Sequence, residues 1–195
     1  MILEIKDIDT LYGNSHILFK VSLSIDKGEA VSLLGRNGAG KTTLMRSIVG
    51  LTPPRSGSIK FKGEELTGKP PFVISRMGMG IVLEDRGIFT DLTVEENLDI
   101  ARKNNGGGSR WTLVQVYELF PTLKSLRNRK GGQISGGKQQ LLAIGRTLMG
   151  NPDFLLLDEP LEGLSPIIAE TIMKQITRLK EGGEITILMS EQNLR

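Results

Sequence analysis

The stretch "GRNGAGKTT" at residues 35–43 carries the strongest structural signal in this sequence. It matches the pattern G-x-x-x-x-G-K-[ST] at every fixed position. A continuous apolar run, "AVSLLG" (30–35), precedes it as a strand buried on both faces would, and "KTTLMRSIVG" (41–50) continues it at helical spacing. Small residues between a strand and a helix let successive backbone N–H groups surround one anion, and the helix N-terminus adds partial positive charge. The stretch therefore predicts a cradle for the phosphates of a nucleotide.

The chemistry of this loop assigns a role to its last residues. Lys41 is expected to reach the β- and γ-phosphates, and the Thr42 hydroxyl to ligate Mg²⁺. The predicted nucleotide-binding residues of the loop are Gly35, Arg36, Asn37, Gly38, Ala39, Gly40, Lys41, Thr42 and Thr43.

Two adjacent acids follow a second apolar run, "FLLLDE" (154–159). The run predicts a central strand that delivers Asp158 at its C-terminal end, the edge at which ligands lie in such sheets. Asp158 would hold Mg²⁺, partly through water. A carboxylate one residue further on, Glu159, can orient and polarise a water molecule for in-line attack on the γ-phosphate. The sequence thus predicts nucleotide hydrolysis.

A second glycine-rich stretch, "QISGGKQQ" (133–140), contains no lysine placed as in the first loop. Ser135 stands where a helix N-cap belongs, so Ser135, Gly136 and Gly137 form a second anion-binding helix start. The amphipathic helix that follows is expected to bury Leu141, Leu142, Ile144 and Leu148. One ATP does not need two cradles on separate sub-domains. We expect this box to serve the γ-phosphate of a second protomer, with ATP between facing subunits.

Composition excludes several other classes of protein. The chain has 195 residues, enough for one core or one core with an inserted sub-domain. Lys plus Arg exceed Asp plus Glu only by 25 to 22, and no basic stripe with interleaved aromatics is present, so nucleic acid is not an expected partner. The absence of cysteine excludes disulfides, thiolate metal sites and thiol catalysis. No apolar run predicts a signal peptide or a membrane span, and we expect a soluble, cytoplasmic chain.

Strands that alternate with helices predict an α/β fold with a parallel sheet and helices on both faces. "GSIKFKG" (57–63) is expected to be an exposed strand, and the acid-ended runs at 154–160 and 184–191 to be buried strands around a helix at about 166–180. Thr93 and Glu96 predict a capping box, and "NNGGGS" (104–109) a turn. The expected organisation is one domain, 1–195, with a nucleotide-binding core at 1–87 and 151–195 and a helical sub-domain at 88–150.

The phosphate loop, "ISGGKQQ" and "LLLDEP", in this order and spacing, resemble the ATP-binding cassette (ABC) ATPases over essentially the whole chain. The resemblance implies a P-loop core with N-terminal antiparallel strands and an inserted helical sub-domain. It implies ATP and Mg²⁺ as cofactors. It also places Gln139 with residues 135–137 in the signature box, Tyr12 on the adenine ring, and "LEGLSP" (161–166) in the D-loop that crosses to the partner protomer.

A finer resemblance is to the ATPases of branched-chain amino acid and urea uptake systems, through stretches such as "EDRGIFTDLTVEENL" and "LLLDEPLEGLSP". It implies an ATP-hydrolysing subunit that powers import and lies on the inner face of the cell membrane. The implied partners are a second ATPase subunit in an ATP-dependent homodimer or paralogous heterodimer, membrane permease subunits and, indirectly, a solute-binding protein. The permease would dock near Glu84 and residues 85–98, where Ile88 and Phe89 either contact it or close the core.

The sequence departs from the family pattern at two candidate site residues. Glu84 stands where most members have glutamine, and its carboxylate could approach both Mg²⁺ and the attacking water. Gln192 stands at the switch position, where most members have histidine. It can donate a hydrogen bond to the γ-phosphate but cannot carry a positive charge. His16 lies far from this position and is expected to be a surface or strand residue.

Two other function classes compete with transport. A soluble ABC ATPase of DNA repair or translation would usually have a long coiled-coil insertion or two cassettes, and neither is visible. A nucleotide kinase or GTPase shares the loop, but the signature box and the absence of an N-K-x-D motif argue against it. Because family members continue beyond "SEQNLR", we also expect a C-terminally shortened chain whose last buried strand lacks a neighbour.

Overall fold

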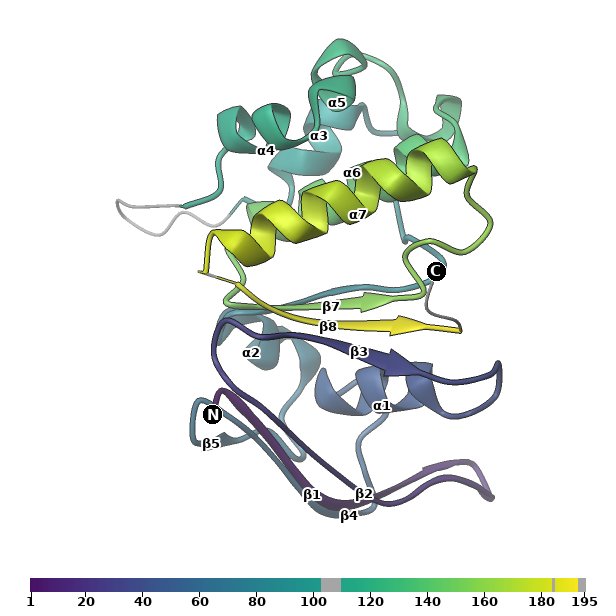
Figure 1. Ribbon diagram of the computed structural model, residues 1–195, viewed down its shortest axis with the longest axis vertical. Helices are drawn as coiled ribbons and strands as arrows, with labels where there is room; N and C mark the ends of the chain where they lie inside the picture. The colour runs from purple at the N-terminus through teal and green to yellow at the C-terminus, as the bar shows by residue number, and fades with distance from the viewer. Residues whose placement is uncertain (103–109, 184, 193–195) are drawn as a thin grey trace.

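The computed structural model describes residues 1–102, 110–183 and 185–192, arranged as two four-stranded sheets and a set of helices (Figure 1). The turn expected at 104–109 lies outside the described residues. The strands are β1 (Leu3–Tyr12), β2 (Ser15–Ile25), β3 (Ala30–Leu34), β4 (Ser56–Phe61), β5 (Glu64–Glu65), β6 (Met79–Val82), β7 (Phe154–Asp158) and β8 (Thr186–Glu191). The helices are α1 (Lys41–Ile48), α2 (Pro71–Arg76), α3 (Val94–Asp99), α4 (Leu113–Leu119), α5 (Pro121–Ser125), the 3₁₀ helix η1 (Gly131–Gln133), α6 (Gly136–Met149) and α7 (Pro166–Glu181).

The parallel sheet has the strand order β3-β8-β7-β6, and it positions the site. All five residues of β7 are buried, as the unbroken apolar run predicts. β8 pairs with β3 on one side and β7 on the other, in a register that sets Asp158 opposite Ser190. Because the strands are parallel, the ends of β3, β7 and β8 meet at one edge of the sheet (Figure 1). The predicted α/β fold is confirmed.

Three expectations about strand burial are wrong. β3 is not buried on both faces. It is the edge strand of the described sheet, so its residues alternate between exposed and half-buried, and Leu34 is 44% exposed. The last strand, β8, does have neighbours on both sides. The strand at 57–63 is not simply exposed, because β4 pairs with β1 in the antiparallel sheet and buries Ile59 and Phe61 against α1.

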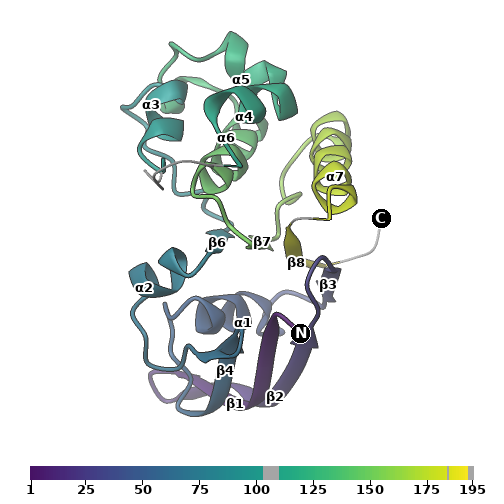
Figure 2. The same ribbon diagram turned by 90° about the vertical axis from the view of Figure 1, so that its left-hand side faces the viewer.

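The helices between β6 and β7 form a group above the parallel sheet in Figure 2. The capping box at Thr93 is confirmed, because its side chain accepts from the Glu96 N–H while the Glu96 carboxylate accepts from the Thr93 N–H. α6 buries all four leucine and isoleucine side chains expected to point inward. One cluster of buried residues continues from α3 and α6 into β7 and α7. The division into a core and a helical sub-domain therefore stays a prediction. Within the described ranges, no helix has the length and apolar character required to cross a membrane.

Candidate nucleotide-binding site

The loop at 35–40 takes a backbone path that requires glycine at its turns. Gly38 has φ +80° and Gly40 has φ +93°, both in the left-handed region. A Cβ at Gly40 would also lie 2.9 Å from a methyl carbon of Leu18. Gly40 is the N-cap of α1 and provides no side-chain cap, so the first N–H groups of this helix stay available to an anion.

A pocket of about 400 Å³ opens beside this loop and brings most of the predicted catalytic groups together. Glu84, in the turn after β6, and Glu159, directly after β7, line it together with residues of the loop. Gly35, Arg36 and Ala39 are not among its lining residues in the described part of the chain. The lining residues are Ile17, Asn37, Gly38, Gly40, Lys41, Thr42, Thr43, Glu84, Glu159 and Glu162.

Lys41 is held by the chain itself. Its Nζ donates to the carbonyls of Gly35 (2.6 Å) and Arg36 (3.2 Å) and forms an ion pair with Glu159 Oε1 (3.0 Å). The Lys41 and Glu159 side chains are only 5% and 9% exposed. Gln192 Nε2 donates to the other Glu159 oxygen at 3.0 Å. The Glu159 carboxylate is thus the anion that pairs with Lys41 in this structure.

These contacts determine the charge of Glu159. Burial alone would raise its pKa, but hydrogen bonds from Glu162, Gln192 and Lys41, together with the Lys41 charge, hold the pKa below its usual value. Glu159 is therefore ionised at neutral pH. Its backbone, at φ +45°, adopts the left-handed conformation that is uncommon outside glycine and is often found at functional sites.

Glu162 is a pocket residue that sequence reasoning missed. It follows Glu159 by one turn, in which the Glu162 N–H donates to the Glu159 carbonyl at 3.1 Å. A hydrogen bond to Glu159, partial loss of solvent and the charges of Glu159, Glu84 and Glu191 raise the pKa of Glu162 to about 7. The sequence signal was present in "LEGLSP", which has an acid three residues after the predicted catalytic glutamate.

This raised pKa predicts a pH-dependent stability. The pKa of Glu162 is higher in the folded chain (about 7) than its ordinary value of 4.5, so its contribution to stability is complete below pH 4.5 and is lost as the pH rises through about 7. Glu162→Gln should therefore melt at a higher temperature than the parent at pH 8, and lose this advantage at pH 5. Because Glu162 is exposed, solvent screening limits the difference in the free energy of unfolding to about 1 kcal/mol. Thermal melts of the nucleotide-free chain check it, with exposed Glu118→Gln as control; a difference independent of pH would contradict the assignment.

Asp158 lies beneath the pocket rather than in its wall. It is fully buried, and its Oδ1 accepts from Ser190 Oγ at 2.7 Å. Ser190 Oγ also accepts from the Glu159 N–H at 3.0 Å, so this hydroxyl fixes both acids. Ser190 is another residue that the sequence did not single out. Asp158 Oδ2 is buried and has no hydrogen-bond partner among the described residues.

This unsatisfied oxygen fits a magnesium site. The described residues contain no group of three or more acidic or histidine side chains that could hold a metal ion by themselves. Mg²⁺ usually keeps several waters and binds through one or two carboxylates plus substrate phosphates. Asp158 and the Thr42 hydroxyl could provide that smaller set, and Glu84 lines the same pocket as Thr42.

The remaining predicted residues lie away from this pocket in the described structure. Tyr12 is 46% exposed at the end of β1, and its hydroxyl accepts from Thr52 at 3.3 Å. Ser135 is the N-cap of α6, without a side-chain cap bond, and Gln139 Nε2 donates to the Gly131 carbonyl at 3.0 Å. The structure therefore does not bring the signature box to the phosphate loop of the same chain. His16 lies in β2, as expected, and is hydrogen-bonded to Asp9.

A glycine loop between a parallel strand and a helix, with acids at the end of another strand of the same sheet, defines a P-loop nucleotide hydrolase. The family model described as "ABC transporter" matches residues 18–162. The chain therefore belongs to the ABC transporter family, and it is an ABC ATPase.

Similar proteins cover most of the chain. The high-affinity branched-chain amino acid transport ATP-binding protein BraG of Pseudomonas aeruginosa is 44% identical over 95% of this chain and 80% of its own length. A protein of Archaeoglobus fulgidus, "Probable branched-chain amino acid transport ATP-binding protein LivF", is 37% identical over 94% of this chain and 78% of its own. The lipopolysaccharide export ATP-binding protein LptB of Haemophilus influenzae is 34% identical over 100% of this chain and 81% of its own.

Solved structures similar to this chain are also ATP-binding cassettes. A nucleotide-free ATP-binding cassette from an ABC transporter superposes with a TM-score of 0.85 at 31% identity, over 99% of this chain and 82% of that one. A dimeric cassette in a post-hydrolysis state, bound to ADP and Pi, superposes with a TM-score of 0.86 at 25% identity, over 98% of this chain and 88% of that one.

Proposed function

We propose that this chain is the ATP-hydrolysing subunit of a membrane importer for branched-chain amino acids or a related small polar solute such as urea. The names of the BraG and LivF relatives support this solute class. A relative named for export at 34% identity shows that family membership alone does not select the solute.

The pocket suggests how ATP is bound and hydrolysed. The N–H groups of residues 37–42 and the Lys41 ammonium would bind the phosphates, and Thr42 and Asp158 would hold Mg²⁺, which neutralises charge on the phosphoryl oxygens when bound. Glu159 would accept a proton from the attacking water. Glu84, which lines the pocket, and Gln192, which donates to Glu159, would orient that water, and Tyr12 would stack on the base.

The second anion site gives this proposal its partner. Ser135, Gly136, Gly137 and Gln139 form a helix start outside their own chain's nucleotide pocket, so a second ATPase subunit facing the first would use them. The post-hydrolysis cassette similar to this chain is itself dimeric.

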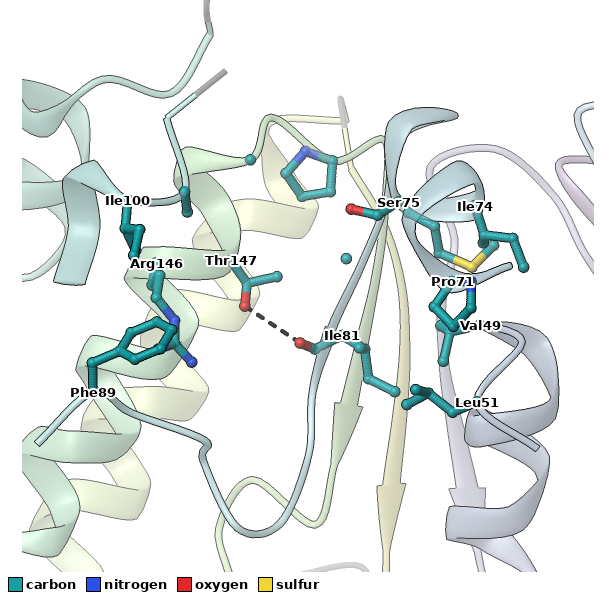
Figure 3. Close-up of a pocket in the computed structure, with 15 residues that line it drawn as sticks. Val49, Leu51, Pro71, Ile74, Ser75, Ile81, Phe89, Ile100, Arg146 and Thr147 are labelled. Atoms are coloured by element: carbon teal, nitrogen blue, oxygen red, sulfur yellow. Dashed lines mark hydrogen bonds between the residues drawn. The ribbon is translucent and has the colours of Figure 1, made fainter. Parts of the chain in front are cut away.

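The single observation that favours a membrane partner is a groove of about 510 Å³ (Figure 3). It lies between the segment from α1 to β6 on one side and the ends of α3 and α6 on the other. Val49 and Leu51 after α1 form one wall, and Phe89, Ile100 and Arg146 form the other. Leu51, Phe89 and Ile100 are 42%, 48% and 59% exposed, so three large apolar side chains that are open to solvent line one groove. We propose that a short helix of a permease subunit occupies this groove.

The structure separates the two residues whose role the sequence left open. Ile88 is partly buried and packs on the core cluster. Phe89 lines the groove, with the Arg146 guanidinium over its ring at 5.1 Å. We infer that Ile88 closes the core and that Phe89 is the residue a partner would contact.

Ile100→Glu tests the groove, because a buried carboxylate is strongly disfavoured in an apolar contact. We expect about a tenfold loss of co-sedimentation with membranes that contain permease subunits of the branched-chain amino acid type, and unchanged ATP hydrolysis by the isolated chain. Val114→Glu is the matched control, since Val114 is 60% exposed outside the groove. Equal binding of both variants, or no membrane binding by the parent, would favour the alternative of a soluble, non-transport ABC ATPase.

A further inference from the structure

The segment 84–89 runs from the nucleotide pocket to the helices above it, and its far end is firmly held. Glu84 lines the pocket. Asn97, fully buried, accepts from the Phe89 N–H at 3.0 Å and donates to the Phe89 carbonyl at 2.9 Å. Arg146 Nη2 donates to the carbonyls of Arg86 (3.2 Å) and Gly87 (2.8 Å). A displacement at Glu84 must therefore be absorbed within the segment or passed to α6.

Arg86 is the side chain through which this segment contacts the start of α6. Its Nε donates to Gln140 Oε1 at 3.0 Å, and Gln140 is only 3% exposed. Its Nη1 lies 3.0 Å from the position that a Cβ on Gly136 would take. The Arg86 backbone has φ +60°, a left-handed conformation that a non-glycine residue keeps only when its surroundings support it.

Among the residues that the structure describes, the Arg86 guanidinium forms no ion pair. Its hydrogen bond is to the neutral amide of Gln140, and its Nη1 lies beside the N-terminal turn of α6. A helix N-terminus carries partial positive charge and does not attract a cation. Gln140 and the shape of the segment therefore hold Arg86 in place, so its position follows the segment.

We propose that Arg86 is a positioning residue that couples the segment bearing Glu84 to the signature box at Ser135–Gly137. The proposal rests on the proposed function, in which nucleotide contacts Glu84 in one protomer and the box of the same chain faces the nucleotide of the other. When ATP displaces the segment through Glu84, Arg86 changes its contact with Gly136 and Gln140 and shifts the first turn of α6. The two nucleotide sites of a dimer are then linked through each chain, as a coupling between two sites requires.

Hydrogen exchange on the monomer tests this coupling directly. At concentrations where size exclusion shows no dimer, ATP with Mg²⁺ should change amide exchange in residues 84–87 and 136–140 of the parent chain. In Arg86→Ala only the change at 84–87 should remain. Arg129→Ala, which removes an exposed arginine of the same helical group, should behave as the parent. An unchanged response at 136–140 in Arg86→Ala would overturn the proposal whether or not the chain dimerises.

Dimer formation gives a second readout that simple misfolding would not mimic. In the Glu159→Gln background, Arg86→Ala and Gln140→Leu should each weaken ATP-dependent dimerisation about tenfold while ATP binding by the monomer stays unchanged. The double variant should be no weaker than the single ones, because both remove one contact. Arg86→Lys should recover part of the loss, since it keeps a donor but not the guanidinium geometry. Additive losses, or weaker monomer binding of ATP, would contradict the proposal; failure of Glu159→Gln alone to dimerise would instead contradict the shared-site function.

Discussion

Glu159→Gln is expected to reduce the turnover of ATP by about a thousandfold, because a positioned general base contributes between about 10² and 10⁴ to rate. The same change should strengthen ATP binding. In the free chain the Glu159 carboxylate pairs with Lys41 at 3.0 Å and competes with phosphate for that ammonium. Glutamine keeps the shape and an acceptor oxygen but removes the competing charge.

The removal of this charge has a cost in the free chain. Lys41 is nearly buried, and a buried charge that loses its partner destabilises a fold. We therefore expect the nucleotide-free Glu159→Gln chain to melt below the parent, and ATP to raise its melting temperature by more than it raises that of the parent. Lys41→Ala should instead lose nucleotide binding.

Steady-state ATPase assays, nucleotide titrations and thermal melts check these three effects together. Glu118→Gln is the control, because it makes the same substitution at an exposed glutamate that does not line the pocket. Parental turnover by Glu159→Gln would remove Glu159 from the catalytic role. Weaker ATP binding by Glu159→Gln would show that its carboxylate does not compete for Lys41.

The positions of the phosphate loop and of the two acids at the end of β7 could be predicted from the sequence because both patterns are local. The spacing of Gly40, Lys41 and Thr42 follows from one turn between a strand and a helix, and Asp158 and Glu159 end an apolar run. The capping box at Thr93 and the buried face of α6 were predicted correctly for the same reason.

Other features depend on contacts between distant segments, which periodicity does not encode. The Ser190 hydroxyl reaches Asp158 across 32 residues, and Arg86 reaches Gln140 across 54. The wrong expectation for β3 has a similar origin. An apolar run shows that a strand can be buried, but its place at the edge of the described sheet is set by strand order.

Mixing two inactive variants should restore activity if the signature box acts on the nucleotide of the partner. Lys41→Ala removes the phosphate ligand of one site, and Gly136→Asp places a carboxylate in the box, beside the Arg86 guanidinium and facing the expected phosphate. Each variant alone loses both sites of a symmetric dimer, because the two sites are equivalent. A mixed dimer keeps one complete site, formed by the phosphate loop of the Gly136→Asp chain and the box of the Lys41→Ala chain.

Random mixing makes half of the dimers mixed, and each has one of its two sites intact. If the sites turn over independently, we expect about a quarter of the parent activity, against almost none for either variant alone. A site contained within one chain would show no recovery. Shared sites that hydrolyse only as a pair would also show no recovery. The same mixture in the Glu159→Gln background separates the two cases, because shared sites should trap one ATP in each mixed dimer. Mixed dimers that neither hydrolyse nor trap ATP would show that Ser135–Gly137 does not complete the partner's site.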